Sequence, residues 1–182
     1  MRHVVKPGAA VEPGPAATLN LRVRGFAGQS ISPADVLQAL AVVPNFHLAG
    51  LREIECACDE AWQVGAQVQA AYLQRERSIR FYRLAASMFG HILHHEIGHH
   101  VFALVIISKL KHLWVTRICA QSSSVTAYGS VSPEEDFAEA YALYLKPSRL
   151  GAQSARGAPK LAFMCELVFS GDPWTLKETK SL

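Results

Sequence analysis

The first half of the chain contains short stretches in which hydrophobic and polar residues alternate, the pattern of half-buried β-strands. A helix is expected to interrupt them, because Ser32 is a good N-cap, Pro33 suits the first helical position and Pro44 ends the apolar pattern after about Val43. Four strands are predicted, at residues 18–26, 51–57, 66–74 and 78–83, the last two as a hairpin around residues 75–77.

The second half of the chain has the spacing of amphipathic helices instead. From about residue 84, apolar residues and histidines recur at alternating spacings of four and three, the stripe that a helix buries: Met88, Ile92, His95, His99, Phe102 and Ile106. Another helix is predicted to begin at Ser132 and Pro133, and a last helix to span about residues 159–169. The sequence thus predicts an α+β fold, a small twisted sheet followed by a helical C-terminal half.

The predicted stripe carries the pattern H-E-x-x-H at residues 95–99. Residues four apart share one face of a helix, so His95 and His99 can direct imidazole nitrogens at one point, and neutral imidazole is a suitable ligand for zinc. Glu96 lies beside that point and can accept a proton from a metal-bound water, the general-base role in peptide hydrolysis. The alternative is a solvated histidine-rich face, but both motif histidines fall in the buried stripe, where an unpaired imidazole is costly.

A third metal ligand is predicted in the helix that follows. Glu135 and Glu139 are four residues apart on one face, and the small Ala138 beside them would let this helix approach the H-E-x-x-H helix closely. Glu135 can then complete a two-His, one-Glu site that leaves a fourth position for water, the arrangement of a catalytic zinc, while Glu139 can fix the tautomer of a ligating histidine. Glu134 and Asp136 are expected to face away from the metal. The alternative is that this acidic first turn only complements the helix dipole.

The two segments together resemble the gluzincin zinc metallopeptidases, in particular the group around anthrax lethal factor and the bacterial Pro-Pro endopeptidases. The resemblance covers residues 89–145 and rests on HHEIGHH at 94–100 and SPEEDFAEAYALYL at 132–145. In that group a helix with E-x-F-A-E follows the H-E-x-x-H helix. Its first Glu binds zinc and its second supports a ligand, which implies these roles for Glu135 and Glu139. The group also places a Tyr seven residues before the ligand Glu, where its hydroxyl stabilises the oxyanion; Tyr128 holds that position, and a zincin-like fold is implied.

These features predict a zinc-dependent endopeptidase that hydrolyses peptide bonds of a protein or peptide substrate through a metal-activated water. In such folds the strand nearest the metal is often an edge strand that can pair with an extended substrate, and residues 78–83 are expected to form it because they immediately precede the H-E-x-x-H helix. One alternative is a peptidase-like regulatory protein of the stress-regulator metallopeptidase type, in which a similar acidic helix ends near a proline, here Pro147. Another is a non-catalytic zinc-binding interaction domain, although a structural zinc has no need of Glu96.

Composition and charge restrict the picture further. With 182 residues the chain is long enough for one domain with a full core, expected at residues 18–182 after a flexible Pro/Gly/Ala-rich lead at residues 1–17. The net charge of +3 is too small to indicate a nucleic-acid partner. The four cysteines lack the spacing of zinc fingers or thioredoxins. Without an export signal they are expected to be reduced thiols, and their even number leaves disulfides as the alternative.

The apolar and basic segments of the chain bear on membrane association and on the compartment of the protein. Residues 101–108 are apolar but too few to cross a bilayer, so no transmembrane segment is expected, whereas the basic Lys109, Lys111 and Arg117 leave contact with a membrane surface open. No apolar segment follows Arg2 and Lys6, which predicts that there is no signal peptide and that the protein is cytoplasmic. The Pro/Gly/Ala-rich start is equally typical of a piece of a longer toxin or effector.

Overall fold

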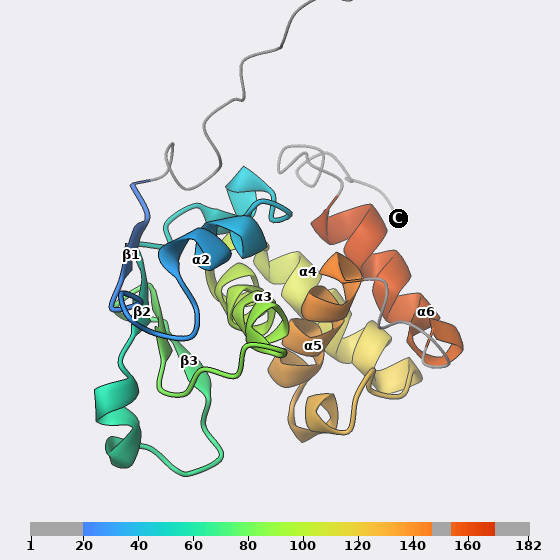
Figure 1. Cartoon of the computed structure of the whole chain (residues 1–182). Coiled ribbons are helices and arrows are strands. Elements are labelled where there is room, and N and C mark those ends of the chain that lie inside the picture. The colour runs from blue at the N-terminus through green and yellow to red at the C-terminus, as the bar shows by residue number, and fades with distance from the viewer. Residues whose placement is uncertain (1–19, 147–153, 170–182) are drawn as a thin grey trace, which may run out of the picture.

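The computed structural model describes residues 20–146 and 154–169, which form a small sheet and a group of helices (Figure 1). This arrangement confirms the predicted α+β class, with the whole sheet built from the first half of the chain. The lead at residues 1–17, the first two residues of the first predicted strand, and Pro147 lie outside the described residues. No helix within the described ranges is both long enough and apolar enough to cross a lipid bilayer.

The sheet contains β1 (Arg22–Arg24), β2 (Glu53–Cys56), β3 (Ala70–Leu73) and β4 (Ser78–Phe81), in the spatial order β1-β2-β4-β3. β1 is parallel to β2 and β2 is parallel to β4, whereas β3 and β4 form the predicted antiparallel hairpin. The prediction that residues 78–83 form the edge strand is wrong, because β4 returns from the hairpin turn to pair with β2. The edge strand that contacts the H-E-x-x-H helix is β3.

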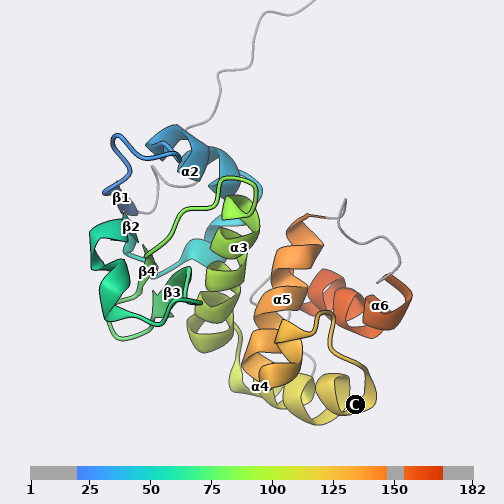
Figure 2. The same ribbon diagram turned by 60° about the horizontal axis from the view of Figure 1, so that its bottom comes forward.

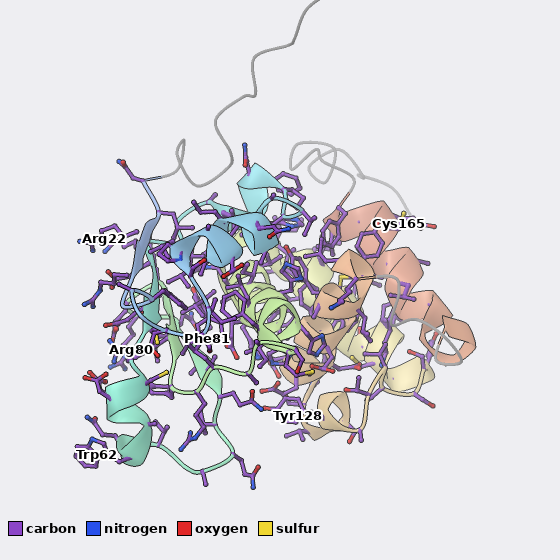
Figure 3. All side chains as sticks on the ribbon, viewed as in Figure 1. Arg22, Trp62, Arg80, Phe81, Tyr128 and Cys165 are labelled. Carbon is purple, nitrogen blue, oxygen red and sulfur yellow. The ribbon has the colours of Figure 1, made fainter. Side chains whose placement is uncertain are left out.

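The register of the strands separates an apolar face from a charged face. The residues that face the core lie opposite one another across three strands: Val23, Ile54 and Ile79. On the other face, Arg24 Nη2 lies 2.9 Å and Arg80 Nε lies 3.1 Å from the carboxylate oxygens of Glu55. Figure 3 shows Arg22 and Arg80 on the side of the sheet that points away from the helices. The apolar face is therefore the one that the helices cover.

α2 (Pro33–Leu40) packs against β1 and begins where the sequence predicts. Ser32 Oγ accepts a hydrogen bond from the Asp35 N–H at 3.2 Å, and the Asp35 carboxylate accepts one from the Ser32 N–H at 2.8 Å, a reciprocal capping box. The helix ends before the predicted Val43. Two 3-10 helices follow later, η1 (Asn45–Leu48) and η2 (Cys58–Gln63).

α3 (Phe89–His100) carries the H-E-x-x-H pattern and lies between the sheet and α5 (Pro133–Leu145), as Figure 2 shows. The predicted stripe is buried in part: His95 and Ile106 are buried, and Ile92 and Phe102 pack against the core. A second row, one or two positions further along, also enters the core: Phe89, Leu93, Ile97 and Val101. Two sides of α3 are covered because the helix packs on the sheet with one and against α5 with the other, and the side with His95 and His99 meets α5.

The remaining helices pack around a second group of aromatic side chains. α4 (Ser108–Leu113) continues into a π-helical segment at Trp114–Cys119, and the 3-10 helix η5 (Tyr128–Val131) leads into α5. The Trp114 ring lies 5.1 Å from Phe137 and 5.1 Å from Phe163, which joins α5 to α6 (Ser154–Phe163). The last helix begins earlier than predicted, because Pro159 lies inside α6 instead of at its first position.

Candidate metal centre

The candidate ligands come from two helices that pack closely at Gly98 of α3. A Cβ atom at Gly98 would lie 2.8 Å from the Cα of Ala138 and 3.2 Å from the Cβ of Tyr141. The glycine therefore lets the two backbones approach to a distance that any larger side chain would prevent. The small residue expected on α5 at this interface, Ala138, is the one that contacts Gly98.

The start of α5 determines which of its residues face α3. Ser132 Oγ accepts a hydrogen bond from the Glu135 N–H at 3.1 Å, and Pro133 occupies the first turn. This cap fixes the helix register, so Glu135 and Glu139 lie one turn apart on the side that meets His95.

His95, His99 and Glu135 form the group that could hold a metal ion in the described part of the chain, with one ligand atom of each within 4.8 Å of the others. His95 Nε2 lies 3.1 Å from both His99 Nε2 and Glu135 Oε2, and His99 Nε2 lies 3.4 Å from the same oxygen. Two ligands of a tetrahedral zinc are expected about 3.3 Å apart. Glu135 Oε2 is buried without a hydrogen bond of acceptable geometry, so the donor set and the orphaned oxygen both fit a divalent ion.

Glu139 contacts His95 on the opposite side of its ring. Oε1 of Glu139 lies 2.9 Å from His95 Nδ1 and 3.3 Å from His91 Nε2. A carboxylate at Nδ1 favours the tautomer that carries its proton there, which leaves the Nε2 lone pair directed at His99 and Glu135. The Glu139 contact is the one expected from the sequence. His91 was missed, although it lies one turn before His95 on the same face of α3.

Glu96 is buried beside the ligands, with 7% of its surface exposed. The backbone N–H of Tyr72, in the edge strand β3, lies close enough to its carboxylate to favour the charged form. Burial raises the pKa of Glu96 above its ordinary value, while the neighbouring His95 and His99 and the Tyr72 N–H act in the opposite direction. The edge strand and the ligand histidines thus lie on either side of this carboxylate.

Tyr128 lies at the start of η5, and its ring centroid is 5.7 Å from that of His95. Figure 3 shows it on the turn that precedes α5. Partial burial, and then the negative charge of Glu135, raises the pKa of Tyr128. The hydroxyl therefore stays protonated and can donate a hydrogen bond toward the ligand cluster.

The histidines and carboxylates of the cluster perturb one another. Burial lowers the pKa of His95, but its contacts with Glu135 and Glu139 outweigh burial and raise that pKa to about 9. The close approach of His95 and then of His99 lowers the pKa of Glu135 to about 2. Burial raises the pKa of Glu139, but its hydrogen bonds to His91 and His95 outweigh burial and lower it. A metal ion entering this cluster must therefore displace a proton from His95.

An open cleft of about 610 Å³ borders one side of the cluster. Ala70, Ala71 and Tyr72 of β3 line it together with His95, Glu96 and His99. In the antiparallel ladder with β4, alternate residues of β3 direct their backbone groups outward, and the Tyr72 N–H that lies close to Glu96 is one of these. The edge strand therefore presents backbone groups that do not pair with β4 along the cleft.

Neither acidic neighbour of Glu135 belongs to the candidate ligand group. Asp136 is 2% exposed; its carboxylate accepts a hydrogen bond from the Val125 N–H at 3.2 Å and pairs with the buried Lys160. Glu134 is exposed and lies in the lining of the cleft, with no contact to the ligand histidines. The geometry therefore favours Glu135 over its neighbours as the third ligand.

Two further histidines of α3 are buried away from the cluster. His94 Nε2 donates to the carbonyl of Ala39 at 2.8 Å, and His100 Nε2 donates to the carbonyl of Ala49 at 3.1 Å. His100 Nδ1 also lies 3.0 Å from the Tyr72 hydroxyl. These histidines connect α3 to α2, to the segment after η1 and to β3, and they leave the metal cluster to His95 and His99.

Comparison of the chain with protein-family models, curated proteins and solved structures gave no match. The indications of function therefore come from the site itself. They are the convergence of three ligand atoms, a buried carboxylate beside them, and a cleft that opens onto both.

Proposed function

We propose that this chain is a zinc-dependent endopeptidase with a zincin-like fold, similar to the gluzincins, in which His95, His99 and Glu135 hold the metal. The observation that carries the proposal is the convergence of these three side chains within 4.8 Å, beside an open cleft and a buried glutamate. Zinc bound there would lower the pKa of a water molecule toward about 7 and polarise a substrate carbonyl.

The residues around the ligands have distinct tasks in this reaction. Glu96 accepts a proton from the attacking water and passes it to the leaving amine. Tyr128 donates its hydroxyl hydrogen to the carbonyl oxygen as negative charge develops, and one such donor typically contributes on the order of 3 kcal/mol. Glu139 holds the His95 ring through Nδ1, at 2.9 Å, and so keeps the other ring nitrogen available for the metal.

The substrate in this proposal is an extended peptide that lies along β3. The outward backbone groups of an edge strand pair with a peptide independently of its side chains. Ala70 and Ala71 are small, so they leave room for a peptide between the strand and the ligand cluster. This arrangement keeps the role expected for an edge strand but moves it from residues 78–83 to Ala70–Leu73.

The test separates metal binding from chemistry. The purified protein should contain about one zinc per chain by elemental analysis, and His95→Ala and His99→Ala should lose it. Glu96→Gln keeps the shape of the side chain but cannot accept the proton. It should therefore retain zinc and melting temperature while peptide cleavage falls by orders of magnitude. Glu134→Gln, a matched change on an exposed carboxylate of the same cleft, should leave both zinc and cleavage unchanged.

Other outcomes would point to the alternative functions. Zinc binding without cleavage of any peptide would overturn the endopeptidase and support a non-catalytic zinc-binding domain. Cleavage confined to a single protein partner would support a regulatory peptidase. A His95→Ala, His99→Ala double variant as zinc-loaded as the parent would place the metal elsewhere in the chain.

A further inference from the structure

One cationic side chain lines the cleft without a part in the chemistry proposed so far. Lys111, on α4, borders the same cleft as His95, His99 and Glu96, although α4 contributes none of the candidate ligands. It is half-buried, so its ammonium has lost part of its contact with water.

The Lys111 ammonium is held in place by few partners. Nζ donates one hydrogen bond to the carbonyl of Ala103 at 2.8 Å and lies 5.7 Å from the centre of the Phe102 ring. The Phe102 ring packs on Phe137 at 5.0 Å, which fixes the surface on which the lysine rests. An ammonium has three N–H groups, and two of them make no hydrogen bond to any residue in the described part of the chain.

The other charges of the cleft do not neutralise Lys111. Glu135 and Glu96 belong to the ligand cluster and its general base, and Glu134 is exposed at the start of α5. Among the described residues, no carboxylate forms an ion pair with Lys111. A partly desolvated ammonium with free donors, facing a cleft of substrate size, is matched by a carboxylate.

We infer that Lys111 forms a subsite that binds a carboxylate group of the substrate peptide near the cleaved bond. The group is an acidic side chain or a C-terminal carboxylate, which share the same chemistry. This inference rests on the proposed peptidase function and names the class of peptide that the site selects. The hydrogen bond to Ala103 positions the ammonium and uses one donor only, so the remaining two are available to the peptide.

Paired peptides provide the test. A peptide that the zinc-loaded protein cleaves is prepared with Asp or Asn at each position around the cleaved bond, and with a free or an amidated C-terminus. At one position Asp should be preferred over Asn by at least about tenfold in kcat/KM, because only the Asp carboxylate can form a charge-assisted hydrogen bond with the Lys111 ammonium. If the free C-terminus is instead preferred over the amide, the subsite recognises a terminal carboxylate.

Variants of Lys111 then show whether this residue causes the preference for the substrate that carries the carboxylate. Lys111→Met should bring the ratio of the paired substrates close to one, and Lys111→Glu should favour the uncharged member. A merely structural role would lower both rates together and leave their ratio unchanged. Lys109→Met is the matched control, because Lys109 is exposed on the same helix and does not line the cleft.

Failure of the subsite and failure of the proposed function look different. If the parent cleaves peptides with no preference for a carboxylate, or if Lys111→Met keeps the parental ratio, the proposed subsite is overturned. The proposed peptidase function is unaffected by either result. If the zinc-loaded parent cleaves no peptide at all, both the proposed function and the subsite that depends on it are overturned.

Discussion

Oε1 of Glu139 lies 2.9 Å from Nδ1 of His95, while the other nitrogen of the same ring lies 3.1 Å from Glu135. One imidazole therefore bridges two carboxylates that are a single turn apart on α5. The two carboxylates are not equivalent, because only Glu135 also approaches His99. Their substitutions should separate a direct ligand from a residue that acts through a ligand.

Glu135→Ala should remove most of the zinc affinity, because it deletes one of three protein ligands. Glu139→Ala should lower affinity by about 10–100-fold, the usual cost of losing a carboxylate that orients a ligand histidine. Competition with a chromophoric chelator measures both. Glu134→Ala is the control and should have little effect. If Glu134→Ala or Asp136→Ala strips the metal while Glu135→Ala spares it, the ligand assignment is off by one position, and Tyr128 loses its assigned role.

Gly98→Ala should disturb the site without touching any ligand. The added methyl would meet the backbone of Ala138 at 2.8 Å, so α3 and α5 must separate or tilt. Overpacking of this kind typically costs on the order of 1–3 kcal/mol of unfolding free energy, and zinc affinity should fall as well because the ligands come from both helices.

Gly90, on the same helix, provides the control for this prediction. A Cβ atom there meets nothing within 4 Å. Gly90→Ala should therefore be neutral or stabilise the protein by up to about 1 kcal/mol through helix propensity. Denaturant unfolding compares the two variants. Equal effects from both would mean that the close approach of α3 and α5 is not required.

Helix starts could be predicted from the sequence because their signals are local. Ser32 and Ser132 each cap a helix, because the side-chain oxygen accepts a hydrogen bond from the N–H three residues further on, and a proline follows each serine. Strand order could not be predicted in this way. Residues 78–83 directly precede α3 in sequence, yet β4 is internal, because its parallel pairing with β2 depends on contacts between distant segments.

In the candidate site, too, the residues that share a local segment could be predicted, and those from distant segments could not. His95, Glu96 and His99 share one helical turn, so their common location follows from spacing alone. The Tyr72 N–H near Glu96 and the Lys111 side chain come from separate segments, and no local pattern marks them. The sequence predicts one buried stripe on α3, whereas the structure covers two sides of this helix, because its partners, the sheet and α5, come from distant segments.

Asp136 and Lys160 form a buried ion pair that ties α6 to α5 and should matter for stability. Their side chains are 3% and 0% exposed. Asp136 also accepts hydrogen bonds from Val125 N–H at 3.2 Å and from Cys119 Sγ at 3.3 Å. Asp136→Asn should destabilise the protein by roughly 3–5 kcal/mol, because it leaves the Lys160 ammonium buried without a counter-charge.

A double-mutant cycle tests this ion pair. Lys160→Met alone should also be costly, since it strands the Asp136 carboxylate in the core. The double variant Asp136→Asn, Lys160→Met should lose less stability than the sum of the two single changes, with a coupling of about 0.5–3 kcal/mol. Additive losses in denaturant unfolding would contradict the pair.

His47 should make stability depend on pH between about 4 and 6.5. The side chain is 0% exposed; its Nε2 donates to the carbonyl of Val168 at 2.9 Å, so its Nδ1 must accept from the Tyr141 hydroxyl, also at 2.9 Å. Burial lowers the pKa of His47 from its ordinary value of 6.5 to about 4, against the opposing effect of the Val168 hydrogen bond. Between these values the unfolded state binds more protons than the folded state, so stability falls as pH decreases through 6.5 and is unaffected above about 7.

The loss attributable to His47 should reach about 2 kcal/mol at pH 5 relative to pH 7. Denaturant unfolding at the two pH values measures it. His47→Gln removes the titrating group but can still donate and accept hydrogen bonds, so its stability should change less between pH 7 and pH 5 than that of the parent. His112→Gln, at an exposed histidine of α4, should keep the parental difference. If His47→Gln keeps it too, the acid sensitivity of the fold arises from another group.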